Sequence, residues 1–109
     1  MLNHISSYKV SEALGENIIC LLPDIGFSNG TAKSGVISFR CRGFLRVVIE
    51  GDFSGRWSDT EQEISGDALD LVMWAMDLSH LAAKHWSYEW LIGQGVPREL
   101  LFNDESCSR

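Results

Sequence analysis

The chain has 109 residues, 45% of them hydrophobic and 22% charged, with a formal net charge of −6. These values are ordinary for a folded protein and predict a single domain, residues 1–109, with one core. The negative charge argues against nucleic acid as the partner, because phosphate binding needs clustered Lys and Arg. It favours a basic protein surface as the partner.

The N-terminus shows no basic segment followed by an apolar one, and no apolar run reaches the ~20 residues of a membrane span. The three cysteines, Cys20, Cys41 and Cys107, are widely spaced. A structural zinc site needs paired Cys or His ligands at short spacing, and the sequence has none. We therefore predict a cytoplasmic protein with free thiols, two of them (Cys20 and Cys41) in strands, and with no metal, cofactor or membrane partner.

The N-terminal third gives weak signals. Residues 1–15 have few apolar anchors and fit either an edge strand or a short helix. Residues 17–22 form a short apolar run that Pro23 closes, and we predict a strand there, because proline cannot donate to a sheet ladder. Residues 24–35 are rich in glycine and predict a loop.

Two segments in the middle of the chain show the alternation of half-buried strands. In residues 36–42 and 44–53 the odd positions are mostly apolar and the even positions mostly polar. An odd-length loop, residues 42–44, keeps the two apolar faces on the same side of the hairpin. The pairs predicted from this loop are Cys41–Leu45, Phe39–Val47 and Ile37–Ile49.

This register places Arg40 opposite Arg46 on the outer face, with Arg42 nearby. Like charges directly opposite each other destabilise a sheet, so an anion is expected close to them. Glu50, Asp52 or another acidic side chain can supply it. The alternative is that the three arginines form a binding site for a small anion or an acidic peptide.

Residues 64–84 form the only long stretch with a helical period. At 100° per residue its polar side chains fall in one narrow stripe, and nearly all others are apolar. The members of this stripe are Asp70, Asp77, His80 and Lys84. We predict an α+β fold, with one long helix over residues 66–84 packed on an antiparallel sheet of about four strands. The apolar arc is wider than one sheet covers, so we expect the chain's own ends, a partner protein or a second subunit in a homodimer to cover its flanks.

The start of this helix collects negative charge. Residues 58–61 match a capping box and residues 65–67 offer a second cap. Carboxylates are favoured there because the helix dipole is positive at its N-terminus. The acidic residues concerned are Asp59, Glu61, Glu63, Asp67 and Asp70.

Beyond the helix, residues 85–93 carry apolar, mostly aromatic side chains at even positions. They predict a strand, with a continuing helix as the alternative. The Gly93–Gly95 segment ends this element, and Pro97 predicts a short helical turn over residues 98–102.

No motif indicates catalysis. His80 and His85 are five apart, so they do not share a helical face, and the metalloprotease, nucleophile-elbow and phosphate-loop motifs are absent. We predict that the protein is not an enzyme. Four tryptophans suit a binding protein, since tryptophan often anchors interfaces. We expect Trp74 in the core and Trp57 exposed, as the anchor of a partner surface made with the five acidic residues.

Leu69, Trp74 and Leu78 mark the long helix of a short acidic chain that has an aromatic-rich sheet and no active site. In this organisation the chain resembles the immunity proteins of bacterial polymorphic toxin systems, including contact-dependent growth inhibition. The resemblance implies a cytoplasmic protein that binds a cognate toxin domain and blocks its active site. Phage-encoded inhibitors of bacterial defence share the profile and are the second hypothesis. A small anion- or ligand-binding homo-oligomeric domain is the third.

Overall fold

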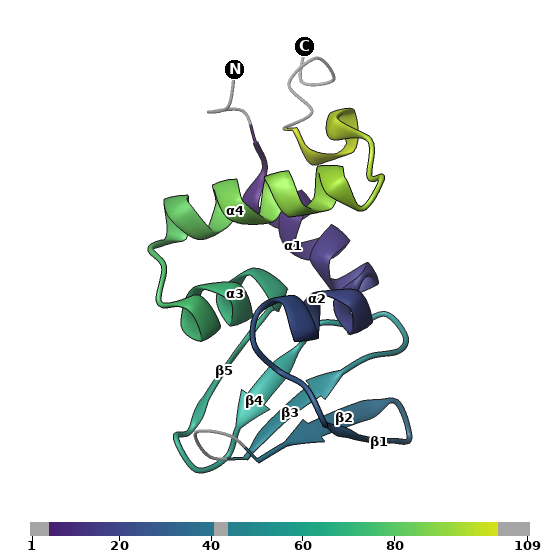
Figure 1. The fold of residues 1–109 in the computed structure, drawn as a ribbon, viewed down its shortest axis with the longest axis vertical. Coiled ribbons are helices and arrows are strands. Elements are labelled where there is room, and N and C mark those ends of the chain that lie inside the picture. Colours follow the sequence, from purple (N-terminus) through teal and green to yellow (C-terminus); the bar gives the residue numbers. More distant parts are fainter. Residues whose placement is uncertain (1–4, 41–43, 103–109) are drawn as a thin grey trace.

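The structure, a computed structural model, describes residues 5–40 and 44–102 (Figure 1). It confirms the predicted α+β class. The elements in chain order are α1 (Ser7–Glu16), α2 (Ile18–Asp24), β1 (Thr31–Lys33), β2 (Val36–Phe39), β3 (Leu45–Val48), β4 (Trp57–Asp59), β5 (Ile64–Gly66), α3 (Ala68–Met76), α4 (His80–Gly93) and the 3-10 helix η2 (Arg98–Leu101).

The sheet is antiparallel and has five strands in the order β1-β2-β3-β4-β5, against the four or so that were predicted. Only β2 and β3 lie in segments predicted to be strands; β1 lies in the segment predicted to be a loop, and β4 and β5 lie between the predicted hairpin and α3, where no strand was predicted. Ser34 and Gly35 join β1 to β2 with φ values of 55° and 80°. Two successive residues with positive φ make the tight turn that suits the twist of a hairpin.

The β2–β3 register keeps the predicted faces and differs in its pairs. Phe39 pairs with Leu45 and Ile37 with Val47, a shift of two residues from the prediction. A shift of two leaves every side chain on its predicted face, whereas a shift of one would not. β2 ends at Phe39 and β3 begins at Leu45, and most of the predicted loop, residues 42–44, lies outside the described residues. Arg40 does not lie opposite Arg46, because Ser38 takes that place, and Cys41 and Arg42 are outside the described residues.

The predicted long helix is wrong in one respect: residues 64–84 contain a strand and parts of two helices. Residues 64–66 pair with β4 as β5. α3 then ends at Asp77, whose backbone is left-handed (φ 56°, ψ 50°), and α4 begins after Ser79, whose hydroxyl accepts from the Ala82 N–H at 3.2 Å. The helical spacing of apolar residues continues past the break at Asp77, because α3 and α4 each bury one face. The polar stripe is consequently divided between α3, the junction and α4.

Two further predictions are corrected. Residues 17–22 fall mainly in helix α2 and not in a strand, with Pro23 in its last turn and Cys20 exposed. Residues 85–93 continue α4, which was the alternative. Trp86 and Trp90 stack at 6.3 Å between ring centroids. Residues four apart share a helical face, so this aromatic spacing fits a helix as well as a strand.

Other boundaries are as predicted. Residues 1–15 include helix α1, one of the two forms expected. α4 ends at Gly93, Gly95 has positive φ, and Pro97 precedes the short helix η2. Proline suits this position because its fixed φ is compatible with the start of a helix.

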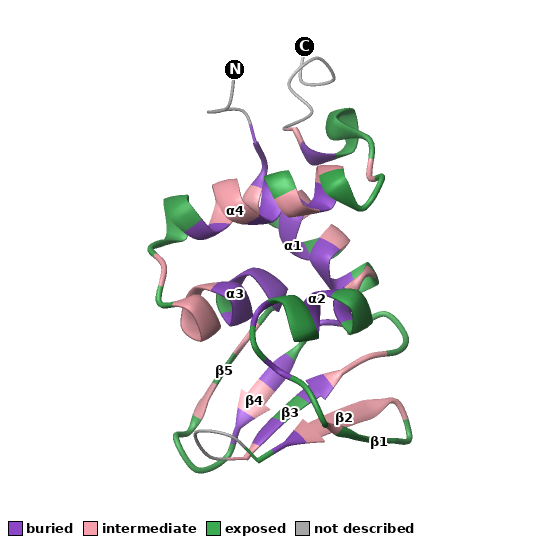
Figure 2. Ribbon diagram, viewed as in Figure 1, coloured by how far each residue is buried: buried purple, intermediate pink, exposed green. Residues whose placement is uncertain are grey.

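The described helices all lie on one side of the sheet, α2 and α3 next to it and α1 and α4 beyond (Figure 1). A row of aromatic rings joins the layers: Phe39 on β2 contacts Phe27 (5.5 Å), Phe27 stacks on Trp74 of α3 (6.2 Å), and Trp74 stacks on Trp57 of β4 (5.1 Å). Buried residues follow the odd face of the sheet and the facing sides of the helices (Figure 2). The apolar arc of α3 is thus covered by the chain itself, through α1 and α4. None of the described helices is long and apolar enough to span a lipid bilayer.

Candidate functional site: an acidic groove beside helix α1

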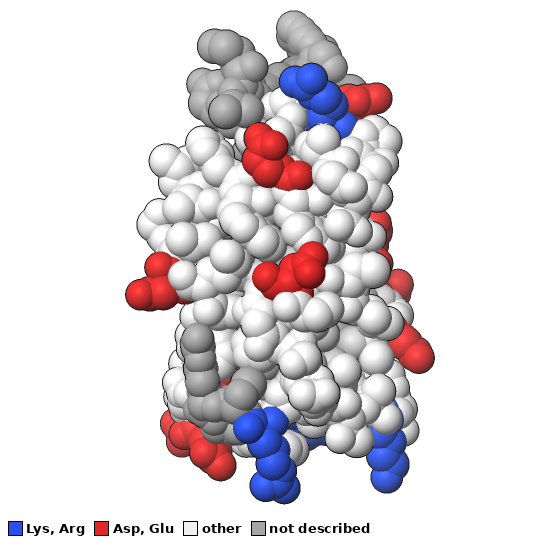
Figure 3. All heavy atoms as spheres, viewed as in Figure 1, with Lys and Arg blue, Asp and Glu red and all other residues white. Residues whose placement is uncertain are grey.

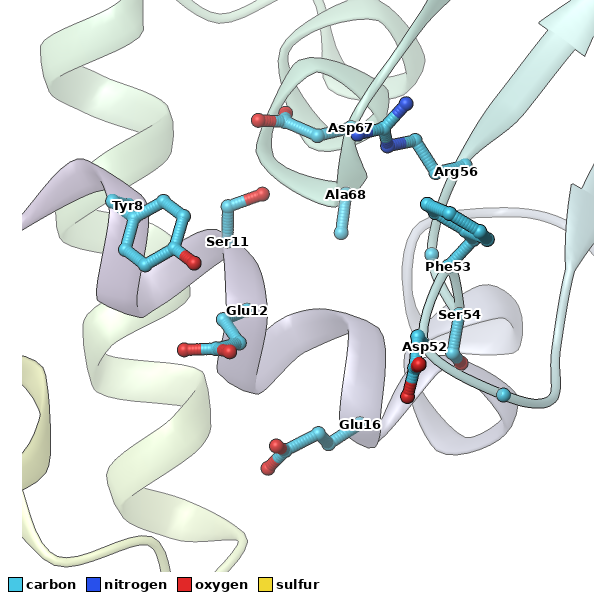
Figure 4. Close-up of a pocket in the computed structure, with 12 residues that line it drawn as sticks. Tyr8, Ser11, Glu12, Glu16, Asp52, Phe53, Ser54, Arg56, Asp67 and Ala68 are labelled. Atoms are coloured by element: carbon cyan, nitrogen blue, oxygen red, sulfur yellow. The ribbon is translucent and has the colours of Figure 1, made fainter.

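A groove of about 330 Å³ lies between α1, the β3–β4 loop and the start of α3 (Figure 4). Its floor is made of small residues, among them Ser11, Ser54 and Ala68. Four acidic side chains line it: Glu12, Glu16, Asp52 and Asp67. Two aromatic side chains stand at its rim and are largely exposed, Tyr8 at 74% and Phe53 at 64%. This combination of carboxylates and exposed rings makes it the candidate site.

The sequence of α1 determines which residues face the groove. Ser6 begins the helix, its hydroxyl accepting from the Lys9 N–H at 3.1 Å. Val10 and Leu14 are fully buried. Tyr8, Glu12 and Glu16 follow at intervals of four, which places them in one stripe on another side of the helix. The core contacts of α1 therefore turn this stripe outward, toward the groove.

Two glycines bring the β3–β4 loop against α1. A Cβ added at Gly15 would overlap the carbonyl oxygen of Ser54, and one added at Gly55 would lie 2.7 Å from the Gly15 Cα. Gly55 also has a φ of 99°, a conformation that costs glycine little. The Ser54 hydroxyl donates to the Gly15 carbonyl at 2.7 Å. This contact holds Asp52 and Phe53 opposite α1.

The start of α3 forms the third wall. The Asp67 side chain accepts from the Asp70 N–H (2.9 Å), and the Asp70 side chain accepts from the Asp67 N–H (3.2 Å), a reciprocal capping box. The Ser11 hydroxyl accepts from the Leu69 N–H at 3.3 Å. These bonds satisfy three N–H groups at or next to the helix start, which have no partner within the helix. The cap predicted at residues 65–67 is thus confirmed at Asp67.

The electrostatics of this wall favour a cation. Partial burial raises the pKa of Asp70 above its ordinary value, and the neighbouring negative charge of Asp67 adds to this rise. Burial removes water that would solvate the charged carboxylate, and a second carboxylate close by repels the charge. A positive group that binds near Asp67 would relieve the repulsion. Arg56 also lines the groove, and its guanidinium lies over the Phe53 ring, 5.5 Å from the centroid.

Two residues of the predicted partner surface are buried. Asp59 is 1% exposed, and its Oδ1 accepts from the N–H groups of Glu61 (2.9 Å) and Gln62 (3.1 Å). It organises the β4–β5 turn. Trp57 is 6% exposed, stacks on Trp74, and donates from Nε1 to the Asp67 carbonyl at 2.8 Å. The prediction of Trp57 as an exposed anchor is therefore wrong, and Asp59 offers no surface to a partner.

The other four acidic residues of the prediction are exposed and do not form one cluster. Glu61 and Glu63 lie in the turn between β4 and β5, and residues 58–61 do not cap a helix. Asp67 and Asp70 lie beyond the other end of β5, at the start of α3. A strand advances ~3.3 Å per residue, so the three residues of β5 keep the two pairs apart. Of the four, only Asp67 lines the acidic groove.

The structure also separates two arginines of the predicted anion site, Arg40 and Arg46. Arg46 lies in the middle of the sheet, opposite Ser38 and Ser58. Arg40 lies over the Phe44 ring, 5.7 Å from its centroid, in a hollow that Glu61 also lines. Sequence reasoning missed Tyr8, Glu12 and Glu16, whose spacing of four was visible once a helix was assumed. No pattern in the sequence pointed to Asp52 or Phe53, because their position depends on the fold.

The described residues contain no group of three or more His, Cys, Asp or Glu side chains arranged to hold a metal ion. The sequence matches no protein-family model, and neither a curated protein nor a solved structure is significantly similar to it.

Proposed function

We propose that this chain is a stoichiometric protein inhibitor that binds a basic segment of its partner in the acidic groove. The observation that carries the proposal is the pairing of four carboxylates with two exposed aromatic rings around one hollow. Lys and Arg side chains can pair with carboxylates and stack on aromatic faces at the same time. Arg56 already lies over the Phe53 ring, and the exposed Tyr8 ring beside Glu12 offers both kinds of contact to a basic residue of the partner.

The placement of the acidic residues supports a protein partner. Glu12 and Glu16 line the groove on one side of α1 and, on the other, a wider hollow of about 820 Å³ between α1 and η2. A partner can thus approach these two carboxylates over a broad area. The net charge of −6 adds a long-range attraction that speeds encounter with a basic protein.

The partner class we propose is the toxin domain of a bacterial polymorphic toxin system, with this chain as its cytoplasmic immunity protein. Many toxin domains that act on nucleic acids need basic surfaces, and an acidic inhibitor complements such a surface. The support for this class is the small acidic chain, the acidic groove and the absence of a catalytic motif from the sequence. A phage-encoded inhibitor of a defence protein would use the same chemistry.

The test is to express the chain with the product of the adjacent reading frame and to measure complex formation by co-purification and association kinetics. The double variant Glu12→Lys/Glu16→Lys should reduce the association rate by tenfold or more and weaken its dependence on salt. The matched control, Glu61→Lys/Glu63→Lys, makes the same change in charge at the β4–β5 turn. We expect it to retain most of the affinity.

Loss of binding in the Glu61/Glu63 variant alone would place the partner at the sheet end and overturn the groove assignment. A neighbouring product without a toxin domain, and without binding to this chain, would overturn the immunity function.

A further inference from the structure

The open face of the sheet is basic, although the protein as a whole is acidic. No described helix covers this face (Figure 1). Strand pairing places two rows of side chains across it. One row is Thr31, Ser38, Arg46, Ser58 and Ser65, and the other contains Lys33, Val36 and Val48. Neither row contains Asp or Glu.

Arg56 extends the second row. Its carbonyl accepts from the Val48 N–H at 2.8 Å, directly before β4 begins. Two shallow hollows meet at Val36 and Arg46, one reaching Arg56 (about 260 Å³) and the other reaching Lys33 (about 390 Å³). Lys33, Arg46 and Arg56 thus line one continuous surface, here called the basic row. It has serine hydroxyls and two valines between its cations.

Lys33 and Arg46 lie on this surface alone, whereas the Arg56 side chain also lines the acidic groove, with its guanidinium over the Phe53 ring. Seven of the chain's nine Lys and Arg residues lie in the described part, and two of these, Lys9 and Lys84, donate to the carbonyls of Phe102 (3.0 Å) and Ile5 (3.2 Å). None of the three cations of the basic row forms an ion pair with another described residue. In Figure 3 the Lys and Arg atoms in view lie at the sheet end and at the opposite end, while Asp and Glu atoms lie in the middle and also at both ends.

We propose that the basic row is a docking surface for an acidic segment of a protein. Charge complementarity carries this assignment. Arg46 can bind a carboxylate with two parallel N–H···O bonds, and Lys33 and Arg56 can pair with further acidic side chains on either side. The serine hydroxyls can donate to the same carboxylates, and Val36 and Val48 give apolar contact to the segment's remaining side chains.

Single-stranded nucleic acid fits this surface less well. Proteins that bind it stack bases on aromatic side chains, and neither of the two rows contains one. Phe44, directly before β3, already has the Arg40 guanidinium over its ring. Arg40 is left out of the surface, because its hollow is shared with Glu61.

The test measures binding of a fluorescent Glu-Thr repeat peptide of eight residues to the full chain by anisotropy, at low and at physiological salt. An alternating repeat presents all its carboxylates on one face when extended. The parent protein should bind it saturably, and Arg46→Glu should weaken binding at least tenfold. Arg98→Glu, with the same charge change on η2, should change affinity less than twofold. Lys33→Glu should weaken binding as Arg46→Glu does, which provides a second, independent variant of the same surface. Circular dichroism of each variant would detect a folding defect.

A parent protein that does not bind the peptide saturably overturns the proposal, as does equal loss in the Arg46 and Arg98 variants. A single-stranded oligonucleotide of equal charge is measured in parallel. Tighter binding of the oligonucleotide, sensitive to Arg46→Glu, would show a phosphate-backbone site and overturn the assignment to a protein segment.

Discussion

The Ser54 hydroxyl donates a 2.7 Å hydrogen bond to the Gly15 carbonyl, which fixes the β3–β4 loop to the end of α1. The loop backbone lies so close that a methyl group at Gly15 would overlap the Ser54 carbonyl oxygen. The acidic groove exists because these two segments touch without side chains between them.

Gly15→Ala should therefore destabilise the protein although alanine favours helices. Intrinsic propensity alone would stabilise α1 by ~1 kcal/mol. The overlap is with backbone, which cannot move aside like a side chain, so we expect a net loss of about 1–3 kcal/mol in the free energy of unfolding. Urea denaturation measures it. Gly93→Ala is the control, because nothing lies within 4 Å of an added Cβ at the end of α4. It should be neutral or slightly stabilising, and a similar loss in both variants would contradict the close contact.

Removing the Asp59 side chain should unfold the β4–β5 turn. Its buried Oδ1 accepts from the N–H groups of Glu61 and Gln62, and Asp59→Ala leaves both without this partner. Hydrogen bonds to a charged group contribute ~1.5–3 kcal/mol, so we expect a loss of that order in stability. Asp59→Asn keeps an oxygen at Oδ1 and should cost less. Chemical denaturation of both variants tests this, and parental stability in Asp59→Ala would show that the turn forms without the side chain.

Ser87→Ala should be neutral or stabilising. The Ser87 hydroxyl is fully buried in α4 and has no hydrogen-bond partner among the described residues. A buried polar group without a partner is unfavourable, and alanine is the better helix former. Ser11→Ala is the contrast, since it removes the acceptor for the Leu69 N–H and should cost ~1 kcal/mol. Thermal unfolding compares them. A clear loss in Ser87→Ala would indicate a partner for its hydroxyl.

The capping pair Asp67 and Asp70 should make stability depend on acidity. Burial and the charge of Asp67 raise the folded-state pKa of Asp70 above its unfolded value of 3.8. The folded state therefore binds the Asp70 proton more tightly than the unfolded state does. The stability that this proton contributes is complete below pH 3.8 and is lost as the pH rises through the folded-state pKa of Asp70. Asp70→Asn keeps an acceptor and removes the titration. The stability of the parent relative to this variant should fall between pH 3 and neutral pH, and a constant difference in melting temperature would contradict the raised pKa.

The sequence alone determined the features that depend on neighbouring residues. Alternation in residues 45–48 predicted that Leu45 and Val47 of β3 are buried, because a strand has a strict period of two, whereas in β2 only Phe39 is buried and its other residues are half-buried. Asp67 was recognisable as a cap, and Gly93 and Pro97 as element boundaries, because these residues act on the backbone beside them. The α+β class followed from these local signals.

Tertiary structure decided what local patterns leave open. The break at Asp77 and the helical state of residues 85–93 could not be predicted, because apolar and aromatic spacing fitted either form until packing on α1 and α3 selected one. Burial of Asp59 and Trp57 depends on partners in the neighbouring turn and in α3. The acidic groove combines α1 with a loop some 40 residues later in the sequence. Such a site arises from packing between distant segments, which no local period encodes.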